Sequence, residues 1–339
     1  MTHEFPIKEI AMQAGLSLAT VDRVLNRRGG VRAITARRVA QAIRELGRQS
    51  EQTVLAGRKF MIDIVMEAPP RFTDIVRRAL EAELPQLRPA VFRSRFYLRE
   101  EIPVRDLVSL LARIGRLGSN GVLLKAPDVP EIRGAIADLR NRRIPVVTLV
   151  TDILNSQRTA YVGIDNRAAG ETAAYLMGQW LRGEPTHVLV TLSSNRFRGE
   201  EEREIGFRRA LREHYPELSI VEVSEGFGRD RTTGLLVQEA LENEPRITAV
   251  YSIGGGNGAI AAAFRVAKRP VCVFIGHDLD ADNRRLLRQG AIHAVLHHDL
   301  RQDMRLACQN VMRAQGALPK DQAMPLSQLQ VITPFNLPG

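Results

Sequence analysis

The chain has 339 residues, of which 44% are hydrophobic and 25% charged, and its formal net charge is +10 at pH 7. This composition is typical of a globular protein and argues against a disordered chain. No apolar run approaches the roughly 18 residues of a membrane-spanning helix, and the first six residues lack the basic-then-apolar pattern of a secretion signal. We therefore expect a cytoplasmic protein without a membrane segment, and the basic balance favours a polyanionic partner.

The length and the two cysteines add two further expectations. A chain of 339 residues is too long for one ordinary core, so we expect a small headpiece and a larger body in two lobes. Cys272 and Cys308 lie far apart, in an apolar strand and a helix respectively. This usage is typical of buried thiols in a reducing compartment.

The N-terminal segment has the pattern of three short helices. The first is expected over residues 7–14 and the second over residues 18–25, each with apolar residues at helical spacing on one face. Gly15 stands where a tight turn requires a positive φ, and Ser17 is a favourable N-cap for the second helix. Together with the third helix, this arrangement is a helix-turn-helix, whose second helix lies in the major groove of DNA.

The third helix is expected to begin at a cap formed by Thr35 and to end at Gly47. The first 58 residues carry ten Lys or Arg against five Asp or Glu. A small helical hairpin with a solvated basic face is the alternative interpretation. The agreement of turn, cap, core spacing and charge favours DNA binding.

The outward face of the second helix is expected to read the bases. Arg23 can form a bidentate pair with guanine, while Leu18 and Ala19 can contact thymine methyl groups. Neighbouring arginines are expected to meet phosphates, namely Arg27, Arg28, Arg32, Arg37 and Arg38.

Four pieces of this segment carry a resemblance to a known family. Residues 7–11 (IKEIA), 14–17 (AGLS), 19–21 (ATV) and 23–26 (RVLN) resemble the headpiece of the lactose-repressor, or LacI/GalR-type, family of bacterial regulators. The family usually has Ser where this chain has Asp22. A carboxylate there repels phosphate and can accept a hydrogen bond from cytosine N4, so we expect an altered operator sequence.

Residues 47–58 connect the headpiece to the body. The resemblance implies that this segment folds into a hinge helix on DNA and that Leu55 inserts into the minor groove. The family's usual Tyr-x-Pro-Asn lead-in is missing, so a plain flexible linker is the alternative. The residues expected to contact DNA are Ser17, Leu18, Ala19, Thr20, Asp22, Arg23, Asn26, Arg27 and Leu55.

The body alternates apolar runs with amphipathic helical segments, which is the signature of βαβ units and parallel sheets. Strands are expected over residues 60–65, 91–98, 121–125, 146–150, 187–192, 219–223, 249–253, 271–275 and 291–296. Helices are expected over residues 74–84, 104–116, 131–142, 168–182, 204–213, 232–242 and 303–314. The pattern resembles the two-lobed periplasmic sugar-binding fold. We therefore expect an α/β fold class. The resemblance implies a helix-turn-helix headpiece and hinge over residues 1–58 and a two-lobed effector-binding and dimerisation domain over residues 59–339.

Ligands of such sheets bind outside the carboxyl ends of the strands. The resemblance implies an aromatic stacking on a sugar ring, an Arg donating to ligand hydroxyls and a carboxylate accepting from them, which is the chemistry that a polyol requires. The residues expected to bind the effector are Phe72, Asp165, Arg203, Asn257, Asp278 and His298. Arg196 and Arg198 leave a phosphorylated or acidic sugar open beside a neutral polyol.

Two further sequence patterns indicate other kinds of site, a dinucleotide site and a metal site. Residues 254–259 (GGGNGA) follow a strand and fit the G-x-G-x-x-A fingerprint of a dinucleotide site, so an NAD-type oxidoreductase with an accessory headpiece is one alternative. Several His and Asp near residues 277–299 suggest a metal, but their spacing matches no firm site. No nucleophile–base arrangement is visible, so we expect neither catalysis, nor a metal, nor a cofactor.

The resulting interpretation is a transcription regulator, most simply a repressor, that binds operator DNA and is controlled by a sugar, polyol or sugar acid. We expect a homodimer, or a tetramer built from it, and no membrane partner. The remaining alternative is a sugar-binding protein without DNA function, against which the missing secretion signal counts.

Overall fold

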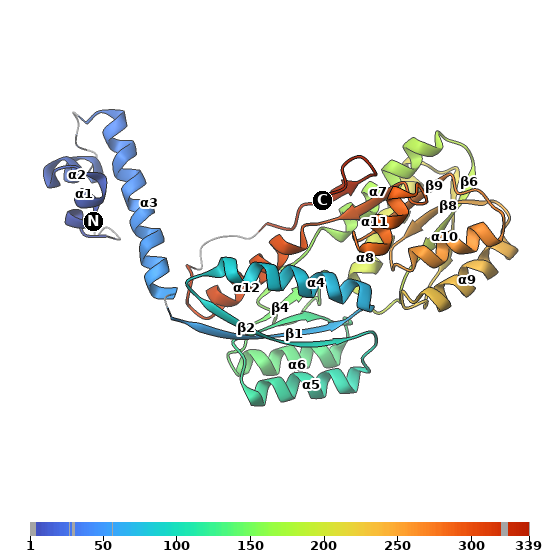
Figure 1. The fold of residues 1–339 in the computed structure, drawn as a ribbon, viewed down its shortest axis with the longest axis horizontal. Coiled ribbons are helices and arrows are strands. Elements are labelled where there is room, and N and C mark those ends of the chain that lie inside the picture. Colours follow the sequence, from blue (N-terminus) through green and yellow to red (C-terminus); the bar gives the residue numbers. More distant parts are fainter. Residues whose placement is uncertain (1–4, 27, 29–30, 56, 320–324, 339) are drawn as a thin grey trace. The chain divides into compact units, whose positions relative to one another are not determined.

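The computed structural model describes residues 5–26, 28, 31–55, 57–319 and 325–338. The chain divides into two compact units, Met1–Lys59 with Leu87–Val91, and Phe60–Gln86 with Phe92–Gly339. The first unit is a helical headpiece and the second is an α/β body (Figure 1).

The headpiece is built from three helices, α1 (Ile7–Ala14), α2 (Leu18–Leu25) and α3 (Ala33–Leu55). Gly15 ends α1 in the left-handed region at φ 59°, a conformation that a side chain would strain. Ser17 caps α2 by accepting a hydrogen bond from the Thr20 amide. The small core between the helices consists of Ile10, Ala11, Ala14, Val21, Val39 and Ala42.

The third helix differs from the prediction at both ends. It begins at Ala33, and the Thr35 amide donates to the Arg32 carbonyl, so Thr35 lies inside the first turn and does not cap it. At its other end α3 passes through Gly47 and continues to Leu55. Glycine only permits a helix to end, and here its φ is not positive, so the helix continues through this residue.

The body contains two sheets with helices packed against them. The first sheet has the order β2-β1-β3-β4-β5 and the second β11-β10-β9-β8-β6-β7. The strands are β1 (Lys59–Glu67), β2 (Val91–Arg99), β3 (Gly121–Lys125), β4 (Val146–Leu149), β5 (Ala160–Val162), β6 (Thr186–Thr191), β7 (Leu218–Val223), β8 (Ile247–Ser252), β9 (Val273–His277), β10 (Ala294–His297) and β11 (Gln330–Ile332). Strands β1, β3, β4 and β5 pair in parallel, and in the second sheet only β11 runs antiparallel to its neighbour.

The helices of the body are α4 (Pro70–Glu83), α5 (Val104–Leu117), α6 (Pro130–Asn141), α7 (Asn166–Leu181), α8 (Arg198–His214), α9 (Asp230–Asn243), α10 (Asn257–Val266), α11 (Ala281–Arg288) and α12 (Leu300–Ala314). A short 3₁₀ helix covers Leu84–Leu87. Helix α12 lies in sequence between β10 and β11 of the second sheet but packs on α4, β4 and β5 of the first. The first lobe is therefore the first sheet with its helices and α12, and the second lobe is the second sheet with α7 to α11.

This architecture confirms the predicted α/β fold class, and the expected strands and helices are present with shifted ends. Strands β5 and β11 were not predicted, because three residues each are too short for a periodic pattern. Helices α10 and α11 were not assigned either; α11 has only eight residues, five of them charged or amide-bearing. Among the described residues, no helix is both long and apolar enough to cross a membrane.

Helices α7 and α8 cross very closely in the second lobe. A Cβ added at Gly170 of α7 would lie 1.9 Å from the Arg203 carbonyl oxygen, and one added at Gly206 of α8 would lie 2.3 Å from the Arg167 carbonyl oxygen. Both contacts are with backbone, which cannot move aside as a side chain can. The two glycines therefore fix the position of α8.

The two cysteines lie in different environments. Cys308, on α12, is fully buried, and burial raises the pKa of its thiol to about 12. Cys272 is exposed, contrary to the expectation that both thiols are buried. It precedes β9, which begins at Val273, so it lies outside the sheet's core.

Candidate functional site

The outward face of α2 carries the residues expected to contact DNA. Leu18 is 55% exposed, which is unusual for a leucine, and Ala19, Arg23 and Asn26 are also exposed. Val21, on the opposite face, is fully buried. The helix therefore presents a mixed apolar and cationic surface that could enter a major groove.

Asp22 has neighbours that the sequence analysis did not anticipate. Its Oδ1 accepts a hydrogen bond from the Asn26 side-chain amide at 2.7 Å, and its Oδ2 pairs with Arg28 at 3.0 Å. Both carboxylate oxygens are thus engaged within the headpiece, although each keeps a further lone pair. Asp22 also orients Asn26 and Arg28, besides any direct contact with a base.

Arg38, Arg27 and Leu55 are other residues predicted to contact DNA. Arg38 donates to the Ala14 carbonyl at 2.8 Å and so caps the C-terminal end of α1. Its guanidinium group therefore has a structural role besides any contact with phosphate. Arg27 lies outside the described residues. Leu55 is the last residue of α3, and only its helical backbone is described.

The body contains a cleft lined by residues of both sheets and their helices. It lies at the carboxyl ends of the strands of both sheets, where ligands of parallel sheets bind. Its polar and aromatic lining consists of Glu67, Arg71, Phe72, Glu100, Lys125, Thr151, Ser193, Phe197, Glu200, Arg203, Phe227, His277, Asp278, Asp280 and Asn283.

Three of the six predicted effector residues line this cleft, namely Phe72, Arg203 and Asp278. Asp165 does not. It is exposed and caps α7, where its carboxylate accepts a hydrogen bond from the Ala168 amide at 3.0 Å. A carboxylate before a helix can serve as a cap or as a ligand group, and this one is used as a cap.

Asn257 and His298 lie behind the lining residues. The Asn257 amide donates to Asn283, which itself lines the cleft, at 2.8 Å. His298 is 1% exposed; its Nδ1 contacts Asp303 at 2.5 Å and its Nε2 lies 4.0 Å from Asp278. Because the Asp303 carboxylate can only accept, His298 carries a proton on Nδ1, and its Nε2 faces Asp278.

Lys125, at the end of β3, was missed by the sequence analysis. Its Nζ donates to the Glu67 carbonyl at 2.8 Å and lies 3.7 Å from the centre of the Phe197 ring. Burial lowers its pKa to about 8, although the carboxylates of Glu200, Glu67 and Asp278 act in the opposite direction. The sequence signal that could have identified it is a lysine at the end of the otherwise apolar run GVLLK.

The buried Glu67 and the half-buried Glu200 complete the charged part of the cleft. Burial raises the pKa of Glu67, and Arg196 partly offsets this effect from 3.3 Å. Glu200 accepts hydrogen bonds from the Ser193 amide at 2.7 Å and from its hydroxyl at 2.5 Å. Arg198, the other predicted anion-binding arginine, pairs with Glu202, so neither arginine is free for a phosphate.

His277 supplies a neutral donor. Burial holds its pKa well below 6.5, and its Nε2 lies 2.9 Å from the hydroxyl of the fully buried Tyr251. The hydroxyl proton has this one acceptor among the described residues, so the tautomer that satisfies it carries its own proton on Nδ1. That Nδ1–H has no partner among the described residues.

Carboxylates outnumber cations in the lining of the cleft. Among the described residues, the lining holds five carboxylates, those of Glu67, Glu100, Glu200, Asp278 and Asp280. Three cations stand in the same lining, namely Arg71, Lys125 and Arg203. No surplus positive charge is left for an anionic ligand.

The glycines of residues 254–256 are explained by packing. A Cβ at Gly254 would lie 1.9 Å from the Ser193 amide nitrogen, and one at Gly255 would lie 2.4 Å from the Arg71 guanidinium. Packing against neighbouring protein atoms therefore accounts for glycine at these two positions. Among the described residues, no group of three or more His, Cys, Asp or Glu could hold a metal ion.

Two family models match the chain. The model for bacterial regulatory proteins of the lacI family matches residues 6–49, and the model for the periplasmic binding protein domain matches residues 108–317. No curated protein sequence matches.

Solved structures similar to this chain share its two-lobed fold. GanP, a glucose-galactose binding protein from Geobacillus stearothermophilus, is 20% identical with a TM-score of 0.72, over 83% of this chain and 99% of its own. A solute-binding protein from Burkholderia graminis C4D1M in complex with D-arabinose is 19% identical with a TM-score of 0.72, over 83% and 97%. A candidate LacI transcriptional regulator from Bacteroides fragilis is 15% identical with a TM-score of 0.70, over 82% and 98%.

Proposed function

We propose that this chain, which belongs to the periplasmic binding protein domain family and carries the DNA-binding domain of the lacI family of bacterial regulatory proteins, is a sugar-responsive transcription regulator. The exposed face of α2 would read operator DNA, and the cleft of the body would bind the effector. A repressor is the simplest mode: effector binding closes the lobes, changes how paired bodies hold their headpieces and so alters operator affinity.

The effector that the cleft suits best is a neutral, polyhydroxylated molecule, and the lack of surplus positive charge carries this conclusion. A sugar acid or phosphate would need cations that are not already paired, and Arg196 is paired with Glu67. Buried polar atoms at or behind the cleft that have no hydrogen-bond partner among the described residues include Glu67 Oε2, Asn257 Oδ1, His277 Nδ1 and His298 Nε2. A hydroxyl both donates and accepts, so it can satisfy acceptors and donors alike.

A thermal-shift screen tests the effector class. The panel is D-glucose, D-galactose, D-arabinose and D-allose, each beside its sugar acid and its phosphate ester. A ligand at 100 times its dissociation constant stabilises the body by about 2.7 kcal/mol. We expect stabilisation by at least one neutral member, repeated as release of operator DNA. Stabilisation by acids or phosphates alone would contradict the proposal.

An oxidoreductase is the second candidate, because the loop at residues 254–259 fits a dinucleotide pattern. The contacts of Gly254 and Gly255 account for those glycines without a cofactor. Enhanced nicotinamide fluorescence on mixing the protein with NADH would favour this alternative. A sugar-binding protein without DNA function would leave the exposed apolar and cationic face of α2 unused.

Three further points belong to the same proposal. The regulator acts as a homodimer, because one reading helix covers only half of a two-fold operator. It acts in the cytoplasm, where its DNA is. Residues 1–58 bind DNA, and residues 59–339 bind the effector and form the dimer. Footprinting upstream of the protein's own gene should reveal a pseudo-palindrome protected in a salt-dependent way.

A further inference from the structure

The chain makes an unusual turn at the end of β4. Val150 has φ 66°, and the Thr151 amide donates to the Leu149 carbonyl at 2.6 Å. This closes a three-residue γ-turn with positive φ, which is rare and strained. For a β-branched residue the conformation is a genuine outlier. Such strain persists only where the surroundings hold it, and it concentrates at sites that switch or bind. Val150 and Thr151 both line the cleft.

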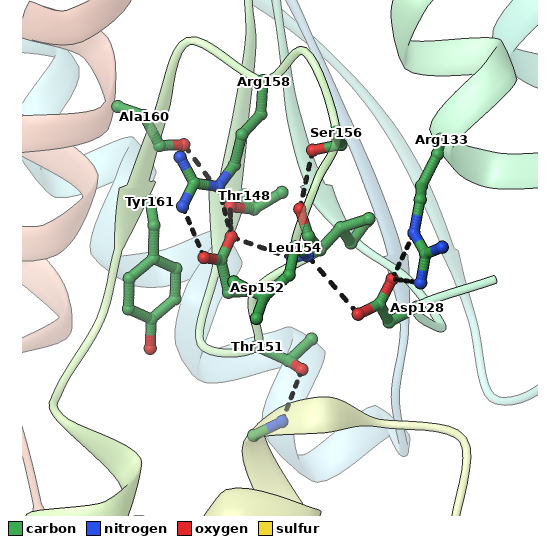
Figure 2. Close-up of polar contacts among 12 residues, drawn as sticks. Asp128, Arg133, Thr148, Thr151, Asp152, Leu154, Ser156, Arg158, Ala160 and Tyr161 are labelled. Atoms are coloured by element: carbon green, nitrogen blue, oxygen red, sulfur yellow. Dashed lines mark hydrogen bonds and ion pairs between the residues drawn. The ribbon is translucent and has the colours of Figure 1, made fainter. Parts of the chain in front are cut away.

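The first lobe holds this turn from one side (Figure 2). The Asp152 carboxylate accepts from the Thr148 hydroxyl at 2.8 Å and from the Ile153 amide at 2.8 Å, and Arg158 grips both of its oxygens. Asp128 reaches the same loop through the Leu154 amide. The loop that follows Thr151 is therefore anchored to its own lobe.

The second lobe contacts the turn from the other side. The amide of Gly199, the second residue of α8, donates to the Thr151 hydroxyl at 2.8 Å, and both groups are buried (Figure 2). The N-cap of α8 is Phe197, whose side chain has no oxygen to accept from the first-turn amides. Thr151 supplies that oxygen from the other lobe. A Cβ at Gly199 would lie 3.1 Å from the Val150 carbonyl oxygen, so the approach is tight.

A second path joins the turn to the cleft. The Asn166 side-chain amide donates to the Val150 carbonyl at 3.3 Å and to the Tyr161 hydroxyl at 3.1 Å, and its oxygen accepts from Arg203 Nε at 2.8 Å. Because an arginine can only donate, the orientation of this amide is fixed. Arg203 is 3% exposed, lies on α8 and lines the cleft.

We propose that Thr151 is a positioning residue that caps α8 across the two lobes, and that this cap couples lobe closure to the placement of Arg203. The proposal rests on the effector role of the cleft proposed above and adds how the site controls the conformation. When the lobes part, the Gly199 amide loses its acceptor and the strained turn loses its second support. The cap therefore favours the closed arrangement, and an effector that contacts Arg203 adds to that preference.

The test measures closure without any ligand. Spin labels are attached at Arg105→Cys on α5 and Glu239→Cys on α9, both exposed positions, in the full chain with Cys272→Ser. Cys308 is buried and stays unlabelled. Pulsed electron paramagnetic resonance then gives the distribution of distances between the lobes for the wild-type turn, for Thr151→Val and for Thr151→Ser.

We expect the valine variant, which keeps the shape but loses the oxygen, to lower the ratio of closed to open molecules about tenfold. The serine variant keeps the oxygen and should retain the wild-type distribution, whereas a purely steric role would not be rescued by it. Equal distributions for valine and wild type, a serine variant as open as valine, or a wild type without any closed population would each overturn the proposal. A failed sugar screen with these results intact would remove the effector assignment and not the cap.

Discussion

The headpiece and the cleft position their functional side chains in different ways. In α2 the reading residues follow one another in sequence, and a local cap and turn present them on one face. In the cleft, Lys125 reaches the Glu67 carbonyl from 58 positions away, and Arg196 reaches the Glu67 carboxylate from 129 positions away. Local chemistry defines the first site, whereas only the packed body defines the second. A change that disturbs body packing should therefore spare the headpiece.

The largest effect that separates the two regions is expected from Gly170→Ala. The new methyl group would overlap the Arg203 carbonyl at 1.9 Å and force α7 and α8 apart. We expect a loss of more than about 4 kcal/mol in the unfolding free energy of the body. Urea titration followed by circular dichroism measures it. Gly134→Ala on α6, where nothing lies within 4 Å, is the matched control and should be neutral or stabilising.

The pH dependence of stability should also belong to the body. The pKa of Lys125 is lowered to about 8 in the folded state, so between pH 8 and about 10.5 the unfolded chain binds more protons. Stability relative to Lys125→Met should therefore rise with pH through this window, by at most about 3 kcal/mol, and stay flat below it. Urea titrations at several pH values give the slope. The exposed Lys8→Met should leave it unchanged; a falling difference would contradict the assigned direction.

Loss of effector response without loss of DNA binding would sharpen the comparison. In the proposed site, Arg203→Ala and Asp278→Asn would each remove a charge-assisted hydrogen bond to the ligand, on the order of 1.5–3 kcal/mol. Operator release is measured against the concentration of the sugar found in the screen. Arg209→Ala, on the same helix but paired with Glu213, should behave as wild type. Release of Arg203→Ala at the wild-type concentration would remove Arg203 from the site.

The smallest effects are expected in the headpiece. Arg23→Ala should lose about 1–3 kcal/mol of discrimination between operator and scrambled DNA, while Arg37→Ala should weaken both alike. Arg38 is not suited to this comparison, because it also donates to the Ala14 carbonyl at the end of α1. Competition binding at fixed salt separates the two outcomes. Equal losses on both DNAs for Arg23→Ala would show that another residue reads the base.

The sequence was sufficient where structure is local. The turn at Gly15 and the cap at Ser17 follow from residue chemistry, and both are found. Periodicity identified the long strands and helices of the body, but a three-residue strand such as β5 has too few positions to show a period. The end of α3 was misplaced because Gly47 is compatible with ending a helix and with continuing it.

The cleft could be predicted only in part for a different reason. Arg203 and Asp278 were predicted from the family resemblance, and both line the cleft. The same reasoning placed Asp165 there, since a capping carboxylate and a binding carboxylate look alike in sequence. Lys125 and Glu200 matter through partners that become neighbours only after folding. No local pattern encodes such pairs.

The labelling rates of the two thiols can be compared to measure how often the body opens. Cys272 is exposed and should react with a thiol reagent at the rate of a free peptide, whereas Cys308 is 0% exposed and reacts only in molecules that have opened around α12. With opening free energies of about 5 kcal/mol or more, its labelling would be slower by at least a thousandfold. The ratio of the two labelling rates therefore gives the free energy of this opening in native buffer.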